Sequence, residues 1–378
     1  MRVSFLGPSG FDQAMTFYFA RFLLLAVVHA ELILRLPISL DVYEPGRPDL
    51  FLIADITVDA MSFRQMVDTG SPLTFFIWRK WYESVEPGGC KTIPSKCYVC
   101  LPECTPGPTE VFSFLDGTEV TLFKHSGAFF FGGKVVRNID FGLMADYNFE
   151  FTLPPSLIGL GYPHKEPAPY EAPYEPLMKQ LLDKPKAQRL IGKNMFSVYL
   201  DSAAKPTGEL LLGGQDPTKY VGPMVFVPSA KDHWAVALIG MKVGANAEVK
   251  FGKPMSTVID TGATGILMSE SYRNKLLKDL QSTATKPVKF QPYNDVFEIN
   301  CADRQSLQPL TLFMRGAGGQ SVPLEIPQEH YIRLDGRHCL LFFGLSDIDT
   351  WSIGNLVLPG RYLLFDYQEN KIGFAKTK

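Results

Sequence analysis

The chain carries one short motif twice, and this duplication constrains its fold more than any other feature. Each copy is an apolar stretch that ends in Asp-Thr-Gly, and the copies are Asp68-Thr69-Gly70 and Asp260-Thr261-Gly262. The copies lie about half the chain apart, and each is followed at similar spacing by a second mark that ends in Ile-Gly: Leu157-Ile158-Gly159 and Ser352-Ile353-Gly354. The repeat predicts two lobes of similar topology, related by an approximate two-fold axis.

Composition and turn signals predict that these lobes are built from strands. The chain has 28 Phe, 15 Tyr, 32 Gly and 29 Pro, a composition that favours strands joined by turns. Hairpins are predicted for residues 50–67 and 111–123, the second around Asp116-Gly117. Helices are predicted only for residues 175–183 and 270–280, so the expected fold class is all-β with a few short helices.

The charge balance argues against nucleic acid as a partner. Lys and Arg number 37, Asp and Glu number 39, and the formal net charge is −2. No basic surplus exists to neutralise a phosphate backbone. Because 46% of the 378 residues are hydrophobic, we expect instead a folded chain with a large apolar core.

Residues 1–30 are predicted to be a secretory signal peptide. Arg2 precedes an apolar run at residues 17–28, and Ala30 ends a site of the kind that signal peptidase cleaves. The alternative is a signal anchor, but the run is shorter than the roughly 18–20 apolar residues that span a bilayer, and it contains Arg21. We expect no stable membrane span beyond this signal, because no other segment is apolar for long enough.

The cysteines are expected to be structural. Four of the six crowd into one stretch and two stand far from it: Cys90, Cys97, Cys100 and Cys104, then Cys301 and Cys339. An even number behind an export signal favours disulfides, while the C-x-x-C spacing of Cys97 and Cys100 leaves a zinc knuckle as the alternative. Three pairings of the crowded four are possible, and the sequence does not choose among them.

Two Asp-Thr-Gly loops have a chemical use in the hydrolysis of an amide bond. Two carboxyls about 3 Å apart cannot both ionise, so they share one proton. The ionised carboxylate, of Asp68 or Asp260, can take a proton from a water molecule held between them, while the protonated partner polarises the substrate carbonyl. Gly70 and Gly262 let backbone amides approach the carboxylates closely, and the threonine hydroxyls can tie the two loops together.

These motifs resemble the pepsin-like aspartic proteases, and the resemblance covers roughly residues 50–375. Beyond the two loops, four segments are similar to family segments in the same order: residues 157–163, 195–200, 208–220 and 351–375. The resemblance implies a bilobal all-β fold with double-psi lobes and a cleft between them. The implied N-terminal lobe is residues 50–203, and the implied C-terminal lobe is residues 204–378.

The resemblance also implies roles for single residues. Asp68 and Asp260 are implied to be the catalytic pair. Thr69 and Thr261 are implied to be the interlocking hydroxyls, and Cys301 and Cys339 match the positions of a family disulfide. The remaining residues that support the catalytic loops are Gly70, Ser71 and Gly262.

A hairpin flap over an extended peptide is implied at residues 112–121, and it departs from the family pattern. Phe114 stands where the family has tyrosine, and Phe75 stands where it usually has tryptophan. In the family the polar groups of this tyrosine and tryptophan form hydrogen bonds. Because both are missing here, neither leaves the other without a hydrogen-bond partner. We interpret the two phenylalanine rings as an apolar pair that positions the flap by packing. The alternative is that the alignment slips and Trp78 supplies the partner. The flap is completed by Asp116, Gly117 and Thr118.

Two further departures concern acidity and activation. The Ser71 hydroxyl can bond to Asp68, but Ala263 offers no such hydroxyl to Asp260, and a lost bond to the ionised form raises the apparent pKa of the pair. We therefore expect a weakly acidic pH optimum. Residues 31–49 are shorter than most family prosegments and carry only Arg35 and Arg47 as cations, so we interpret them as a short leader and first strand or as a vestigial propeptide.

The leading hypothesis is an aspartic endopeptidase that cleaves peptide or protein substrates, prefers apolar residues at the cut bond, and works as a monomer without metal or cofactor. The rival is an inert pepsin-like protein that binds peptides or acts as an inhibitor. Such relatives usually lose an Asp, Gly or Thr of one loop, and none is lost here. The export signal implies the secretory pathway, with a secreted protein or one in an acidic vacuolar or lysosomal compartment.

Overall fold

The computed structural model describes residues 32–44, 47, 49–114, 116–148, 152–163, 174–185, 189–294, 296–346 and 350–378. All of them belong to one compact unit, residues 31–378. The predicted signal peptide, residues 1–30, lies outside the described residues. Within the part of the chain that is described, no helix is long and apolar enough to cross a membrane.

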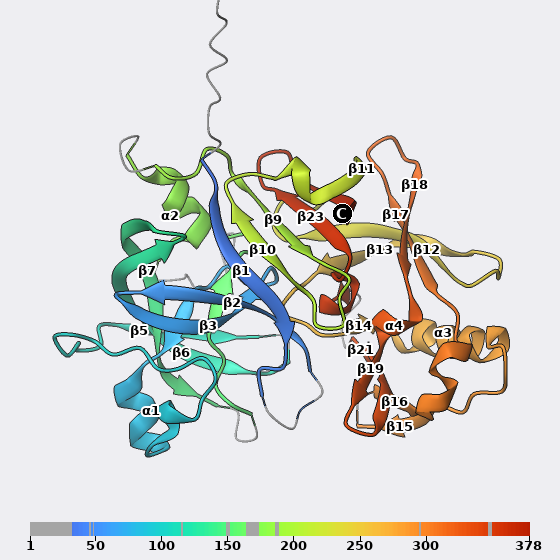
Figure 1. The fold of residues 1–378 in the computed structure, drawn as a ribbon, viewed down its shortest axis with the longest axis horizontal. Helices are drawn as coiled ribbons and strands as arrows, with labels where there is room; N and C mark the ends of the chain where they lie inside the picture. The colour runs from blue at the N-terminus through green and yellow to red at the C-terminus, as the bar shows by residue number, and fades with distance from the viewer. Residues whose placement is uncertain are drawn as a thin grey trace, which may run out of the picture. The chain divides into compact units, whose positions relative to one another are not determined.

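The largest sheet has thirteen strands among the described residues (Figure 1). From edge to edge its order is β11 (Tyr220–Pro228), β24 (Lys371–Thr377), β23 (Arg361–Asp366), β9 (Met195–Leu200), β10 (Thr207–Leu212), β1 (Leu34–Asp41), β2 (Phe51–Val58), β3 (Met61–Asp68), β8 (Leu157–Gly159), β4 (Phe75–Ile77), β7 (Lys134–Tyr147), β6 (Glu119–Phe131) and β5 (Thr109–Ser113). The predicted leader therefore contains a strand of this sheet, because β1 pairs with both β10 and β2.

Two smaller sheets are built from the second half of the chain. The seven-stranded sheet runs β18 (Ser321–Ile326), β17 (Leu310–Arg315), β12 (Ala235–Val243), β13 (Val249–Ile259), β22 (Trp351–Ile353), β14 (Ile266–Met268) and β21 (Phe343–Leu345). The four-stranded sheet runs β15 (Gln291–Tyr293), β16 (Val296–Ile299), β20 (His338–Leu341) and β19 (Ile332–Asp335). The all-β prediction is confirmed, and the two predicted helices are α2 (Leu177–Asp183) and α3 (Glu270–Thr283). The sequence did not predict α1 (Arg79–Val85) or α4 (Gln328–Tyr331).

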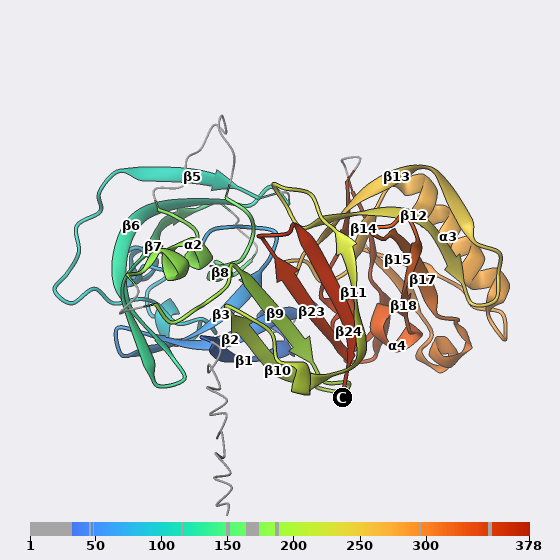
Figure 2. The ribbon, with the colours of Figure 1, turned by 90° about the horizontal axis from the view of Figure 1, so that it is seen from above.

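The two halves of the chain meet in the thirteen-stranded sheet. Figures 1 and 2 show β9, β23 and β11 between the strands of the first half and those of the two smaller sheets. The predicted lobe boundary, between residues 203 and 204, falls in the turn that joins β9 to its antiparallel neighbour β10. The fold is thus the expected bilobal one, and the placement of the boundary at this turn stays a prediction.

The internal repeat of the sequence appears as one strand pattern built twice. In the first half, β3 runs parallel to β8, with Val67 opposite Ile158, and β8 is antiparallel to β4. In the second half, β13 runs parallel to β22, with Val258 opposite Ser352, and β22 is antiparallel to β14. The pattern then extends to a parallel pair in each half, β4 with β7 and β14 with β21. Each Asp-Thr-Gly motif therefore leaves the end of an equivalent strand.

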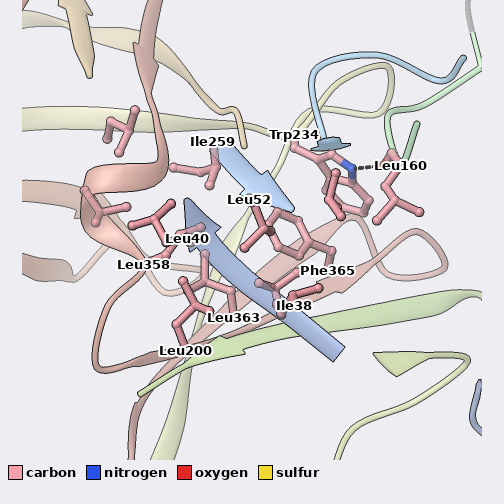
Figure 3. Packing of buried hydrophobic residues seen from close by; sticks show 14 of the residues in the cluster. Ile38, Leu40, Leu52, Leu160, Leu200, Trp234, Ile259, Leu358, Leu363 and Phe365 are labelled. Carbon is pink, nitrogen blue, oxygen red and sulfur yellow. Dashed lines mark hydrogen bonds between the residues drawn. The ribbon is translucent and has the colours of Figure 1, made fainter. Parts of the chain in front are cut away.

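The core that supports these strands is shared by both halves. Strand β1 alternates buried and more exposed residues, which directs Ile38 and its apolar neighbours inward. Figure 3 shows Ile38, Leu200, Leu363 and Phe365 in one apolar cluster, and Trp234 beside Leu160. The indole Nε1–H of the fully buried Trp234 donates to the Leu160 carbonyl at 2.8 Å. Burial of this continuous apolar surface holds the ends of β3 and β13 in fixed positions.

Candidate active site

The two aspartates lie at the ends of equivalent strands and face each other. Asp68 is the last residue of β3, and its backbone carbonyl accepts the N–H of Leu160 at 2.7 Å. Asp260 follows β13 directly, and its N–H donates to the Ile353 carbonyl at 3.0 Å. The two side chains are close enough for a hydrogen bond between the carboxyls. The repeat thus brings together the pair that the sequence singled out.

The glycines of the motifs make this approach possible. A Cβ at position 70 would lie 2.7 Å from an oxygen of Asp260, and a Cβ at position 262 would lie 2.6 Å from an oxygen of Asp68. Each glycine N–H instead donates to the aspartate of its own loop, at 2.7 Å for Gly70 and 2.8 Å for Gly262. Glycine therefore leaves room for the opposite carboxyl as well as supplying a donor to its own.

The two threonines lock the loops to each other. The Thr261 hydroxyl donates to the Val67 carbonyl at 2.6 Å and accepts the Thr69 N–H at 3.0 Å. The Thr69 hydroxyl donates to the Ile259 carbonyl at 2.7 Å and accepts the Thr261 N–H at 3.0 Å. Both threonines are about 98–99% buried, so these four bonds are shielded from water. The interlocking arrangement matches the one expected from the sequence.

The environment of the aspartates favours retention of a proton. Asp68 is only 6% exposed, while Asp260 keeps some accessible surface. Burial raises the pKa of both carboxyls, and the nearby Asp260 raises the pKa of Asp68 further. The N–H groups of Gly70 and Gly262 act in the opposite direction because they stabilise the ionised form. Such a pair can hold one proton between two carboxyls at a pH where isolated aspartates are ionised.

This proton has a consequence for stability. Because the folded state binds it more tightly than the unfolded state, the pair stabilises the fold most below about pH 4, and this stabilisation is lost as the pH rises through the raised pKa. We predict that an Asp68→Asn variant loses less stability than the wild type between about pH 4 and pH 7. Urea unfolding at several pH values measures this difference, at about 1.4 kcal/mol per pH unit for each retained proton. Parallel profiles for the two proteins would contradict the prediction.

Ser71 contacts Asp68 in a different way from the one expected. Its backbone N–H, rather than its hydroxyl, donates to Asp68 at 3.3 Å. The hydroxyl instead accepts the N–H of Leu73 at 3.1 Å and so stabilises the turn after the motif. The presence of Ala263 at the matching place in the second loop is therefore a smaller chemical difference than the sequence implied.

The predicted flap is a hairpin formed by β5 and β6, with Phe112 opposite Val120. At its turn the N–H of Thr118 donates to the Asp116 carboxylate at 2.9 Å, and Gly117 has a φ of +83° that favours glycine. The ring of Phe114 lies 6.5 Å from that of Phe75, centre to centre. The structure therefore brings together the two rings that the sequence paired.

The alternative partner for the flap packs elsewhere. The Trp78 ring contacts Phe123 in an edge-to-face arrangement, with ring centres 5.1 Å apart. Phe75 is fully buried, while Phe114 is only partly buried against the same apolar cluster. Phe114 therefore keeps part of its surface exposed.

All six cysteines form disulfides. The pairs are Cys90–Cys97, Cys100–Cys104 and Cys301–Cys339, and no free cysteine remains. The last pair is the one implied by the family resemblance. Among the described residues, the group best placed to hold a metal is Cys100, Cys104 and His125, whose ligand atoms lie within 4.8 Å of one another. The two sulfurs are bonded to each other, so this group offers no thiolate to a zinc ion.

A cavity of about 520 Å³ lies away from the aspartates. It is bordered by α1 and by the loop that carries the crowded cysteines, and its lining includes Trp78, Glu83 and Tyr98. No residue of either Asp-Thr-Gly motif lines it. The carboxyl pair, rather than this cavity, has the chemical groups that a hydrolytic reaction needs.

Two buried polar side chains beside the second loop were not predicted from the sequence. Thr264 and Asn355 are 7% and 0% exposed, and both hydrogen-bond with the backbone of Leu50. A signal was present in the repeat, because Asn355 follows the second Ile-Gly mark at the place where Leu160 follows the first. A polar residue in one copy of the repeat, where the other copy has an apolar residue, indicates a buried side chain that forms hydrogen bonds.

Comparison with known proteins adds an independent line of evidence. A family model described as eukaryotic aspartyl protease matches residues 119–377, a stretch that includes the second motif and begins after the first. Pepsin-2B of Gadus morhua is 27% identical over 236 residues, which cover 57% of this chain and 68% of that protein. Napsin-A of Mus musculus is 29% identical over 231 residues, 57% of this chain and 50% of that protein. Cathepsin D of Gallus gallus is 31% identical over 208 residues, 51% of this chain and 48% of that protein. The chain thus spans about half to two thirds of the length of these relatives.

Proposed function

This chain belongs to the eukaryotic aspartyl protease family, and on that premise we propose that it is an endopeptidase that hydrolyses peptide bonds. The proposed catalytic residues are Asp68 and Asp260. One of them is ionised and takes a proton from a water molecule placed between the carboxyls, and the other donates its proton to the carbonyl of the bond to be cut. The attack of this water on the carbonyl carbon forms a tetrahedral intermediate, which breaks down when the nitrogen of the leaving amine is protonated.

The observation that carries this proposal is the pair of neighbouring carboxyls, Asp68 buried and Asp260 partly buried, each with a glycine N–H donor of its own. Two acids that share a proton supply both the base and the acid of the reaction without a metal or cofactor. The test is cleavage of a denatured protein between about pH 3 and pH 7, with and without a statine-type transition-state mimic. Inhibitor-sensitive cleavage supports the proposal, and its absence at every pH would reject it.

The alternative proposal, an inert protein that binds peptides, draws on the departures from the family pattern. Ala263 replaces a hydroxyl beside Asp260, and Phe114 and Phe75 replace two polar side chains near the flap. An inert protein would bind the statine-type mimic or an apolar peptide and leave that peptide intact. Mass spectrometry of the peptide after incubation separates the two proposals.

An apolar preference at the cut bond is supported by the side chains around the flap. Phe112 and Phe75 are buried in an apolar cluster, and Phe114 and Tyr147 pack against its edge. A large apolar substrate side chain that covers the open side of Phe114 would gain burial of roughly 1–2 kcal/mol. We therefore propose that substrates present such a residue next to the cut bond.

A Phe114→Ala variant tests this preference. Loss of the ring should lower kcat/KM for peptides with a large apolar residue at the cut by about 5- to 30-fold, which corresponds to that burial. The same change should affect peptides with alanine at the cut much less. Thermal unfolding should shift little, because the ring is only partly buried. Equal losses for both peptides would mean that the ring does not contact the substrate side chain.

The proposed location is the secretory pathway, and the proposed state is a monomer. Three disulfides support an oxidising compartment, in agreement with the signal peptide expected at residues 1–30. We propose that the final site is outside the cell or an acidic vacuolar or lysosomal compartment. Fractionation of cells that express the tagged chain, followed by sizing of the purified protein, tests both proposals.

A further inference from the structure

The backbone of one residue of the first half, Leu50, is held by side chains of the second half, close to Asp260. The Thr264 hydroxyl accepts the N–H of Leu50 at 3.1 Å and lies 3.0 Å from its carbonyl oxygen. The Asn355 carboxamide donates to the same carbonyl at 3.2 Å. These contacts join residues that are 214 and 305 positions apart. They form a second connection between the halves, separate from that of the two motif threonines.

The connection continues directly into the second catalytic loop. The Asn355 carboxamide also donates to the carbonyl of Thr261, the residue after Asp260, at 2.8 Å. The backbone N–H of Asn355 donates to the Ala263 carbonyl at 2.8 Å. The Asn355 side chain is therefore a fully buried bridge between Leu50 and the loop that carries the second carboxyl.

The first loop has no side-chain bridge of this kind at the matching place. Leu160 occupies the position of Asn355 in the repeat, and its hydrogen bonds are made by its backbone: its N–H donates to the Asp68 carbonyl at 2.7 Å, and its carbonyl accepts from Trp234 at 2.8 Å and from Tyr367 at 2.6 Å. Asp68 accepts two N–H donors of its own loop, whereas the matching donors of the second loop give Asp260 only the N–H of Gly262. In the second loop the bridge adds a side-chain restraint through the Thr261 carbonyl.

The other end of the bridge leads toward the flap. Leu50 is followed by Phe51, the first residue of β2, whose ring lies 6.4 Å from that of Tyr43. Phe51 packs against the same apolar cluster as Phe114. A shift of the Leu50 backbone would therefore displace both the residues of this cluster and the second catalytic loop.

From this arrangement we propose that Thr264 and Asn355 are positioning residues. Their hydrogen bonds to the Leu50 backbone hold the loop of Asp260 in the position that the reaction requires. The inference rests on the proposed function and deepens it. A carboxyl displaced by about 1 Å from its working position can cost about 100-fold in rate. Both side chains are buried and act on the position of the loop that carries Asp260, so their loss should affect kcat more than KM.

The test compares Thr264→Val, which keeps the shape and removes the hydroxyl, with Thr264→Ser, which keeps the hydroxyl. Thr264→Val should lower kcat about 10- to 100-fold with KM changed less than about 3-fold, and Thr264→Ser should restore kcat to within about 3-fold of the wild type. Asn355→Ala should lower kcat in the same way. Because both side chains hydrogen-bond with the Leu50 carbonyl, kcat of the Thr264→Val/Asn355→Ala double variant should fall by less than the product of the two single-variant reductions.

The control is Thr311→Val, the same change at a threonine of β17 that is 6% exposed and lies outside the catalytic loops. It should leave kcat unchanged. A Thr264→Val variant that is folded and as active as this control would overturn the inference, and so would a loss carried entirely by KM. Loss of cleavage in Asp260→Ala, measured alongside, would still support the proposed function if the inference failed.

Amide hydrogen exchange gives a readout that does not depend on activity. Loss of the hydrogen bonds to Leu50 should speed amide exchange in residues 260–263 of the Asn355→Ala and Thr264→Val variants, relative to residues 68–71 of the same protein. Equal exchange in wild type and variants would overturn the inference even if cleavage were lost for another reason. If Thr264→Val does not fold, Asn355→Ala and Thr264→Ser still provide both measurements.

Discussion

Replacement of Asp68 or Asp260 with alanine should lower kcat/KM for peptide cleavage by about 10⁴-fold or more, the size of loss typical when one member of a catalytic unit is removed. The reason is that the two carboxyls share one proton and serve as acid and base together, so neither alone supplies both. The double variant should be no worse than either single one. Cleavage of an apolar peptide, followed by chromatography under single-turnover conditions, measures the loss.

These variants should still fold, which separates chemistry from stability. Burial raises the pKa of both carboxyls, so above about pH 4 the pair costs the folded state some stability that alanine does not cost. The thermal midpoint of each variant at pH 7 should therefore not fall below that of the wild type. The matched control is Asp55→Ala on β2, whose side chain is 75% exposed, and it should remain fully active. A single variant at position 68 or 260 with more than about a tenth of wild-type activity would show that the catalytic assignment is wrong.

The sequence predicted those features that short, local patterns determine. A duplicated motif at the end of an apolar strand predicts two lobes of similar topology, and the structure builds the same pairing twice, β3 with β8 and β13 with β22. The turn at Asp116-Gly117 is likewise local, because glycine alone adopts a φ of +83° without strain. The hydrogen bonds of the motif glycines and threonines needed only residue types and the proximity of the loops.

Features that depend on distant partners were not predictable. Helix α1 has seven residues, too few to be stable alone, and it forms where Tyr82 is buried by the surrounding fold. Three pairings of the crowded cysteines were open, and only the folded loop selects Cys90 with Cys97. The contact of Leu50 with Asn355 joins residues 305 positions apart, so no local pattern in the sequence could place them together.

Replacement of Thr261 with valine should destabilise the protein by about 2–6 kcal/mol. The change removes a hydroxyl that donates to the Val67 carbonyl and accepts the Thr69 N–H, and it leaves both groups buried without a partner. Each unpaired buried group costs about 1–3 kcal/mol. Valine has nearly the shape of threonine, so the loss reports the hydrogen bonds and not a cavity. Urea unfolding with an unchanged m value measures it.

Two further variants show whether the destabilisation comes from loss of the hydrogen bonds between the two loops. Thr261→Ser keeps the hydroxyl and loses a methyl group, so it should cost only about 1 kcal/mol. Thr257→Val makes the same change at a fully buried threonine of β13, whose hydroxyl donates to the Met255 carbonyl of its own strand at 3.3 Å. It should cost less than Thr261→Val, because that weak local bond can be lost without separating the halves. If the three variants proved equally stable, the threonines would not join the two loops, and the carboxyl pair would owe its geometry to the apolar core alone.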